Sequence, residues 1–223
     1  MKKLLVIVLL LGFSYVFKDD VQSLWSGIYD KKVYIAVPTI AQKPELPRGC
    51  EVTALAMMLQ HAGRDVSKLE LAKQLTKVPF ENGGLKGNPN DGFVGDMYSF
   101  NQPGLGVYNR PIEQLANQYL PNRIINLSGK GFDEVITHLD EKKPVWVIQN
   151  AKYDVLSEGE WQSWETSEGP INVTYQEHSV LVIGYDKNQV YFNDPLTGQT
   201  EKAPKEGFIA GWEQMGSQAI TYR

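Results

Sequence analysis

The amino-acid sequence predicts an α+β fold, in which a helical part comes first and an antiparallel β-sheet follows. The clearest helical periodicity lies at residues 50–62, and the clearest strand pattern lies at residues 178–194. Hydrophobic residues make up 42% and charged residues 22% of the 223 residues, which is typical of a folded globular protein. The length indicates one domain with a sizeable core.

The N-terminus has the pattern of an export signal. Lys2 and Lys3 precede an apolar run, Leu4 to Phe17, which is shorter than the roughly 17 to 25 residues that span a bilayer as a helix. We therefore expect residues 1–18 to be a signal peptide or an N-terminal membrane anchor, and the protein to be extracellular or attached to the cell surface. Residues 19–33 are predicted to be a spacer, and residues 34–223 to be the folded domain.

The first elements of the domain lead to one strong helix. Tyr34 to Ile40 is a short β-type run that contains Pro38, which favours an edge strand. Residues 42–49 contain two prolines and a glycine and predict an extended loop. From residue 50 to residue 62 the pattern becomes helical, with apolar residues spaced i, i+3, i+4 and i+7 at Val52, Leu55, Ala56 and Leu59. This spacing predicts a single apolar stripe.

The remaining elements are predicted from shorter patterns. Helices are expected at residues 69–75, 111–119 and 132–141, and strands at 145–148, 178–185 and 189–194. Residues 82–107 and 151–176 have little periodicity and read as long loops, the first of which is a candidate wall of a cleft.

The chain contains one cysteine, Cys50, so an intramolecular disulfide cannot form. A lone thiol in an exported protein is a buried inert group, an intermolecular bridge or a reactive group. Cys50 is the first residue of the predicted helix, where the helix dipole and free N–H groups lower the pKa of a thiol. Gly49 precedes it and would let a substrate approach closely.

A reactive thiol needs a base, and three histidines are available. His61 lies at the far end of the predicted helix, about 16 Å from Cys50, and is expected to cap carbonyls there. His138 lies inside another predicted helix and is expected to lie on the surface or to have its hydrogen bonds satisfied by neighbouring groups. His178 opens an apolar strand and is the best candidate for the base.

Asp194 is the candidate that orients His178. If residues 186–188 form a three-residue turn, Tyr185 faces Gln189 and Asp194 faces Val180, diagonal to His178 and on the same face. A two-residue turn would shift the register by one and send the two side chains to opposite faces. Asp194 precedes a proline, so a purely turn-forming role is the alternative.

Three further residues are candidates for contact with a substrate. Gln42 lies on the proline-containing loop before Cys50, and its amide could join the Cys50 backbone N–H in binding an oxyanion. Trp161 and Trp164 are candidates for the wall of a cleft, and core packing is the alternative for both.

The string QKPELPRGCEVTALAMMLQHAG, residues 42–63, resembles the nucleophile segment of bacterial peptidases related to the bacteriocin-processing double-glycine peptidases. The similarity continues through residues 87–96, 106–112, 177–180 and 193–195. The resemblance implies a papain-like cysteine peptidase fold, with the nucleophile helix packed on a C-terminal antiparallel sheet. It also implies that Cys50 is the nucleophile, His178 the general base and acid, Asp194 the orienting residue and Gln42 the oxyanion donor.

The expected function is hydrolysis of peptide bonds by a Cys-His-Asp triad, with a peptide or protein as substrate and with no metal or organic cofactor implied. The bacteriocin-processing peptidases are commonly joined to an export ATPase, whereas this sequence has no GxxxxGK[ST] phosphate loop. The formal net charge of -4 and the lack of a basic stripe do not favour nucleic acid as a partner. Two alternatives stay open: a cell-wall amidase or acyl transferase on the same fold, and a non-catalytic binding module.

Overall fold

The computed structural model describes residues 31–223, of which Val33–Arg223 form one compact unit. The predicted signal or anchor at residues 1–18 and most of the predicted spacer lie outside the described residues. Within the described part of the chain, no helix combines the length and the apolarity that crossing a membrane requires.

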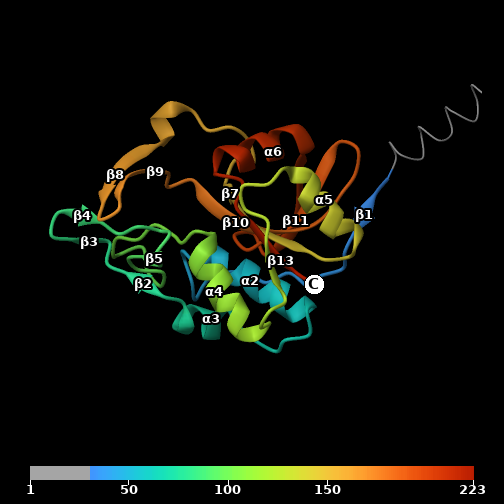
Figure 1. Cartoon of the computed structure of the whole chain (residues 1–223), viewed down its shortest axis with the longest axis horizontal. Helices are drawn as coiled ribbons and strands as arrows, with labels where there is room; N and C mark the ends of the chain where they lie inside the picture. The colour runs from blue at the N-terminus through green and yellow to red at the C-terminus, as the bar shows by residue number, and fades with distance from the viewer. Residues whose placement is uncertain (1–30) are drawn as a thin grey trace, which may run out of the picture. The chain divides into compact units, whose positions relative to one another are not determined.

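A seven-stranded antiparallel sheet forms the centre of the unit (Figure 1). Six strands follow one another across it in the order β12 (Gln199–Pro204), β11 (Gln189–Asp194), β10 (Glu177–Tyr185), β7 (Val145–Asn150), β13 (Ala219–Tyr222) and β6 (Ile124–Asn126). The seventh, β1 (Val33–Tyr34), pairs with the end of β10. Of the edge strand predicted at residues 34–40, only Tyr34 therefore lies in a strand. The α+β class is confirmed.

Helices cover both faces of this sheet. Trp146 and Gln149 lie three residues apart on β7, so their side chains point to opposite faces. The Trp146 indole N–H donates to the carbonyl of Glu51 in α2 (Cys50–His61), at 3.0 Å. The Gln149 amide donates to the carbonyl of Phe208 in α6 (Lys205–Gln214), at 2.7 Å. Therefore α2 packs on one face and α6 on the other.

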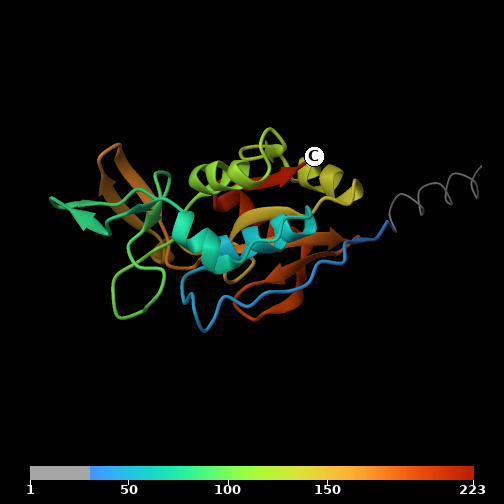
Figure 2. The same cartoon turned by 90° about the horizontal axis from the view of Figure 1, so that it is seen from below.

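The remaining helices pack around these two. Helices α3 (Lys68–Gln74) and α4 (Asn109–Tyr119) both contact α2, and Figure 2 shows α2 lying between α4 and the strands. Helix α5 (Phe132–Asp140) contacts β1, β7 and β10, and a short 3-10 helix, η1, spans Glu158–Glu160. The helices predicted at 69–75, 111–119 and 132–141 are each confirmed to within about two residues at each end.

Helix α2 is the most deeply buried helix of the described chain. It begins at Cys50, as predicted, and its apolar stripe is fully buried. However, every residue from Cys50 to Leu59 is buried, including Glu51 and Thr53. The prediction of a single buried stripe was too narrow, because α3, α4 and the sheet surround the helix on several sides.

Two long segments predicted as loops contain short strands. The loop predicted at residues 82–107 holds β4 (Leu85–Lys86), β5 (Phe93–Val94) and the end of β3 (Glu81–Asn82), and β2 (Lys77–Val78) lies just before it. The prediction of a loop at 151–176 was wrong, because β8 (Gln162–Thr166) and β9 (Gly169–Val173) form a hairpin there. Strand β8 contacts β4, and the two hairpins lie together on the left of Figure 1. A small apolar cluster of Val94, Leu105, Trp164 and Val173 joins this region.

The β10–β11 hairpin differs from its prediction at the turn and agrees with it at the far end. The Asp186 N–H donates to the Gln189 carbonyl at 2.9 Å and Tyr185 faces Val190, which is the register of a two-residue turn. A β-bulge between Val182 and Gly184 then shifts the pairing back by one residue, so that Leu181 faces Asn193. The predicted three-residue turn was wrong, but the bulge restores the register that places Asp194 on the face of His178.

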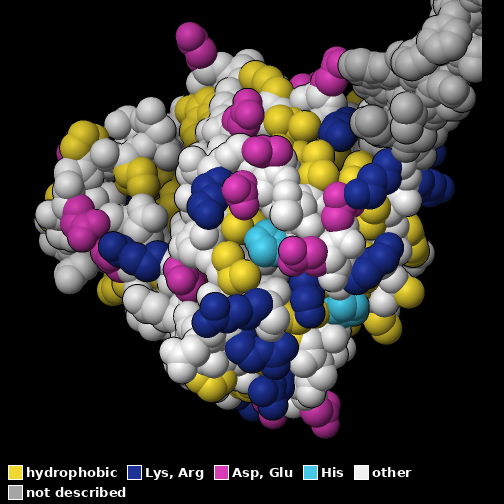
Figure 3. All heavy atoms as spheres, turned by 45° about the vertical axis from the view of Figure 1, so that its right-hand side comes forward, with side chains coloured by type: hydrophobic (Ala, Val, Ile, Leu, Met, Phe, Trp, Pro, Cys, Tyr) yellow, Lys and Arg dark blue, Asp and Glu magenta, His cyan; other side chains and the backbone are white. Residues whose placement is uncertain are grey.

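On the face of the molecule drawn in Figure 3, acidic and basic side chains are interspersed, with Lys and Arg more frequent toward its lower part.

Candidate active site

Cys50 occupies the first position of α2, and its backbone N–H precedes the first hydrogen bond of the helix, from Thr53 N–H to Gly49 O. Gly49 is needed here for packing. A Cβ atom on Gly49 would lie 2.5 Å from Cβ of Leu46, so only glycine lets the chain fold back on Leu46 before the helix. This requirement differs from the substrate access expected from the sequence.

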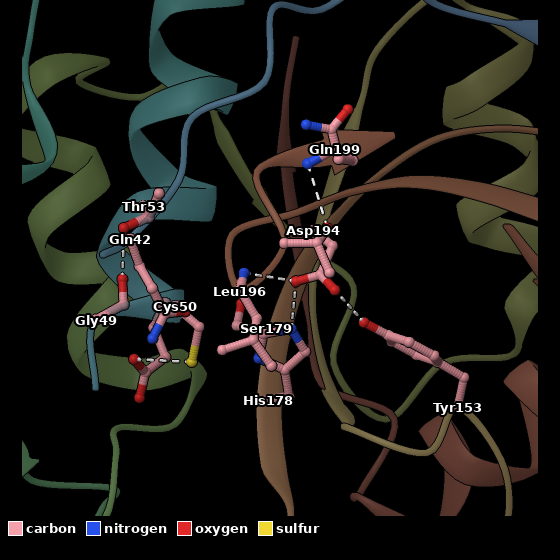
Figure 4. Close-up of polar contacts among 12 residues, drawn as sticks. Gln42, Gly49, Cys50, Thr53, Tyr153, His178, Ser179, Asp194, Leu196 and Gln199 are labelled. Atoms are coloured by element: carbon pink, nitrogen blue, oxygen red, sulfur yellow. Dashed lines mark hydrogen bonds and ion pairs between the residues drawn. The ribbon is translucent and has the colours of Figure 1, made fainter. Parts of the chain in front are cut away.

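His178 and Asp194 form a buried pair (Figure 4). Nε2 of His178 and Oδ1 of Asp194 are 2.7 Å apart. The Leu196 N–H also donates to Oδ1, at 2.7 Å, and the Tyr153 hydroxyl donates to Oδ2, at 2.9 Å. Burial alone would raise the pKa of Asp194, but the hydrogen bond and positive charge of His178, with the other two donors, hold it below its usual value.

The contact with Asp194 defines the role of each ring nitrogen. Because Nε2 of His178 is engaged by the carboxylate, Nδ1 is the nitrogen that remains for a thiol or a substrate. Successive side chains of a strand point to opposite faces, so Glu177 and Ser179 face α2, whereas His178 projects toward Asp194 and Tyr153. In Figure 4, Cys50 lies on one side of this strand and the Asp194–Tyr153 contact on the other.

The Cys50 thiol lies beside the backbone of Ser179, the residue that follows His178. Among the described residues, its hydrogen bond goes to Oε2 of Glu51, at 3.4 Å, and not to the imidazole. Burial, followed by the charges of Glu51 and Glu177, raises the pKa of the Cys50 thiol well above its ordinary value. The predicted lowering by the helix N-terminus was wrong for this arrangement, because two buried carboxyl groups and desolvation outweigh the dipole.

Gln42 is 3% exposed and lies on the loop that precedes Cys50. Its Nε2 donates one hydrogen to the Pro47 carbonyl, at 2.7 Å, and the amide carries a second hydrogen for another acceptor. The Gln42 backbone N–H donates to the carbonyl of Pro195, next to Asp194, at 2.7 Å. The Lys68 ammonium holds the same loop through the Ala41 and Gln42 carbonyls, at 2.5 and 3.0 Å.

The two predicted cleft tryptophans lie in different surroundings. Trp164 is 5% exposed and packs in the small apolar cluster, where its ring meets that of Phe80 edge-on. Trp161 is half-buried and lines a pocket of about 740 Å³ between β8 and the ends of α4 and α6. Tyr108 also lines this pocket, and burial and then the charge of Glu177 raise the Tyr108 pKa.

The other two histidines lie away from Cys50. The His61 ring contacts the Tyr222 hydroxyl on β13, so the expectation that it caps the carbonyls of α2 was wrong. His138 in α5 lies 3.6 Å from the Glu141 carboxylate. Three groups at the site were not found from the sequence: Glu51, Glu177 and Tyr153. Glu51 directly follows Cys50, and Glu177 directly precedes His178. These positions next to the predicted site residues are the signal that could have identified them.

Comparison with known proteins identifies relatives for nearly the whole described chain. The sequence model of the Peptidase_C39 like family matches residues 34–220. The uncharacterized protein YvpB of Bacillus subtilis (strain 168) is 49% identical over 178 residues, which are 79% of this chain and 70% of that protein.

Two solved structures are also similar. The crystal structure of a provisionally named C39-like peptidase from Bacillus anthracis has a TM-score of 0.86 and 50% identity, covering 87% of this chain and 98% of that one. The peptidase domain of Streptococcus ComA, a bi-functional ABC transporter involved in a quorum sensing pathway, has a TM-score of 0.48 and 16% identity, covering 83% and 96%.

Proposed function

The chain belongs to the Peptidase_C39 like family, and from this premise we propose that it is a cysteine peptidase that uses Cys50, His178 and Asp194. The observation that carries this proposal is the buried His178–Asp194 pair, in which Nε2 and Oδ1 are 2.7 Å apart. The residue after His178 is Ser179, whose backbone lies beside the only thiol of the chain. A carboxylate that accepts three hydrogen bonds has its orientation and ionised state defined, as an orienting group requires.

The proposed reaction begins with the transfer of the Cys50 proton to Nδ1 of His178. This step requires the thiol to leave Glu51, because Glu51 holds its hydrogen bond. The thiolate attacks the carbonyl carbon of a peptide bond, and the imidazolium then protonates the leaving amine. His178 next removes a proton from water, which hydrolyses the thioester and restores the free enzyme. Asp194 stabilises the imidazolium in both halves of the reaction.

The oxyanion of each tetrahedral intermediate is assigned to two donors. The first is the Cys50 backbone N–H, which has no acceptor within the helix. The second is the Gln42 amide, whose remaining hydrogen is free while the other bonds Pro47. Such donors are worth about 10² to 10³ in kcat when one is removed.

The substrate and location are proposed from the sequence pattern and the family. A peptide or protein segment is the proposed substrate, with the pocket lined by Trp161 and Tyr108 as the candidate site for its side chains. We propose that the protein acts outside the cytoplasm, because residues 1–18 have the pattern of an export signal. Immunodetection in the medium, membrane and cytoplasm of a producing cell tests this location, and a purely cytoplasmic signal contradicts it.

The test of the enzymatic proposal is hydrolysis of a peptide library by wild type and by Cys50→Ala. We expect turnover by wild type and background only by the variant, since Cys50 is the sole thiol of the chain. Retained turnover in Cys50→Ala rejects Cys50 as nucleophile. Parallel assays on purified cell-wall fragments separate a peptidase from the amidase or transferase alternative.

One observation favours a second function, that of a binding module without turnover. Cys50 is only 7% exposed and its hydrogen bond goes to Glu51 instead of His178, so the arrangement is that of an inactive thiol. In a binding module, Cys50→Ala and wild type bind the same peptides equally well and neither hydrolyses them. Isothermal titration with peptides from the library, compared with turnover, distinguishes the two functions.

A further inference from the structure

Two carboxyl groups flank the Cys50 thiol and take no part in the reaction proposed above. The Cys50 sulfur and one carboxylate oxygen from each of Glu51 and Glu177 lie within 4.8 Å of one another. Glu51 follows Cys50 in α2, and Glu177 is the first residue of β10 on the face that meets α2. The three groups therefore come together where the start of the helix meets the start of the strand.

The backbone next to this pair leaves room for it. The Val107 N–H donates to Oε1 of Glu51, at 2.8 Å. A Cβ atom on Gly106 would lie 2.3 Å from Oε2 of Glu177 and 2.7 Å from Oε1 of Glu51. Glycine at position 106 thus allows both carboxyl groups to pack against one stretch of backbone, side by side and next to the sulfur.

The surroundings provide little compensation for two negative charges. Glu51 is 0% exposed, and Oε1 of Glu177 is buried without a hydrogen-bond partner. Among residues 31–223, neither carboxyl group forms a salt bridge with a lysine, an arginine or a histidine. Two adjacent buried carboxylates repel each other and lose their hydration, so the stable arrangement retains a proton on at least one of them.

We propose that Glu51 and Glu177 form a proton-holding pair that controls the ionisation of Cys50. When Glu51 is protonated, it donates its hydrogen toward sulfur and leaves the Cys50 proton to His178. When Glu51 is ionised, it accepts the thiol hydrogen and keeps Cys50 neutral. The pair's function rests on the proposed function, because the thiol proton must reach His178 for the control to affect catalysis.

The expected pH dependence follows from the groups around the sulfur. Those facing it or its partners are Glu51 from α2, Glu177 and His178 from β10, Tyr108 from the segment before α4, and Asp194 and Tyr153 beyond His178. Burial raises the pKa of Glu51 to about 7, and burial with the neighbouring Glu51 charge raises that of Glu177 well above its ordinary value. Peptidase activity is therefore expected to fall as the pH rises through about 7.

The test is the rate of alkylation of the sole cysteine by iodoacetamide as a function of pH, which requires no turnover. At about pH 8, where Glu51 of the wild type is ionised, we expect Glu51→Gln to be alkylated about tenfold faster than wild type. The alkylation rate of Glu177→Gln is expected to match wild type up to about pH 8, because Glu51 is still present in this variant and titrates as before. The two rates should differ only at higher pH, where Glu177 of the wild type ionises. Glu206→Gln, an exposed charge on α6, is the matched control and is expected to behave as wild type.

An alkylation profile of Glu51→Gln that matches wild type overturns the proposal. Because an unfolded variant would also be alkylated fast, near-UV circular dichroism of each variant must match wild type. Infrared spectra of the whole protein supply an independent readout. A band from a protonated buried carboxyl group is expected at neutral pH, and Glu177→Gln should weaken it. Absence of this band from wild type contradicts the proposed pair. Failure of the peptidase proposal is recognised separately, by a wild type that is alkylated with this pH dependence but hydrolyses no peptide.

Discussion

At Asp194, three donors from three different segments converge on one buried carboxylate. His178 and the Leu196 N–H share Oδ1, and the Tyr153 hydroxyl alone occupies Oδ2. Each donor stabilises the ionised form, so their sum overcomes the penalty of burial. Tyr153 is thus a positioning residue, which acts on His178 through Asp194.

Replacing Tyr153 by Phe removes one donor and leaves the ring packed on Phe192 and Phe208. The pKa of Asp194 is then expected to rise, because a hydrogen bond that lowers it is lost. The acid limb of the pH profile of kcat/KM should move to higher pH, with a loss of about tenfold at its lower end, as for a charged hydrogen bond of about 1.5 kcal/mol. An unshifted acid limb would show that Tyr153 serves packing alone.

The sequence was sufficient to predict those site residues whose place in a helix or strand suggests their role. It did not reveal the residues that reach the site only through contacts between distant segments. Cys50 at a helix start and His178 at a strand start were identified in this way, and Asp194 was placed from the hairpin pattern. Tyr153 lies in a segment without periodicity, so its approach to Asp194, 41 residues away, left no signal in the sequence. Glu51 lies in the first turn of α2, where acidic residues are commonly exposed, and it is buried because the sheet and Gly106 enclose it.

Among the elements, the β10–β11 hairpin shows how a wrong local prediction led to the right face. Asp186 accepts from the N–H groups of Asn188 and Gln189, both at 2.8 Å, and this favours the tighter turn. The bulge that corrects the register depends on β1, because the Ile35 N–H donates to the Ile183 carbonyl at 2.8 Å. A bulge imposed by a third strand cannot be read from the hairpin alone.

Gly184 in this bulge is expected to be intolerant of a side chain. A Cβ atom there would lie 2.1 Å from the Val33 carbonyl oxygen, so Gly184→Ala must displace β1 or the bulge. We expect a loss of about 1 to 3 kcal/mol in the free energy of unfolding, measured in urea. Gly159→Ala is the control, because its Cβ atom would meet nothing within 4 Å. Equal stability of the two variants would contradict the proposed role of the bulge.

Helix α3 supports the loop that carries Gln42. The Lys68 side chain is only 12% exposed, and its ammonium binds two loop carbonyls and Glu45. Lys68→Ala is expected to loosen the oxyanion donor and lower kcat by about tenfold, less than complete removal of a donor costs. Its KM and the alkylation rate of Cys50 should stay near wild type, as should all parameters of Lys73→Ala, an exposed lysine of the same helix. A change in alkylation instead of kcat would locate the effect at the thiol.

Helices and strands without strong patterns escaped prediction at the C-terminus. Strand β12 is mostly polar, and α6 contains Gly207 and Gly211, which weaken helix propensity. Both form because the sheet provides their partners, β11 for the strand and β7 for the helix. Tertiary contacts therefore decide these elements, whereas α2 and β10 could be predicted from their own residues.

For the whole molecule, the buried Glu51 links stability to pH. Its pKa rises from 4.5 to about 7 in the folded state, so the folded state binds a proton that the unfolded state has released between these values. The stability from this proton is fully present below 4.5 and is lost as the pH rises through about 7, a change of about 3 kcal/mol. Asp194 acts in the opposite direction. Because its pKa is lowered in the folded state, it contributes stability above its ordinary pKa, and this stability is lost as the pH falls below that value.

Urea unfolding at about pH 5 and about pH 8 measures this linkage. We expect wild type to be less stable at the higher pH and Glu51→Gln to lose only the part of that difference that Glu51 contributes, because the pKa of Glu177 is raised as well. Glu206→Gln should keep the whole difference. Wild type with the same free energy of unfolding at both values would show that Glu51 is not protonated in the folded state.

The most direct measurement of the peptidase proposal is the mass of the protein quenched in acid during turnover of a peptide ester. The sole cysteine makes the site of any thioester unambiguous. We predict an added acyl mass on Cys50 in wild type, none in Cys50→Ala, and none above background in His178→Ala. An acyl group that forms equally well without His178, or turnover of the ester with no acyl group on Cys50, would contradict the proposed catalytic pair.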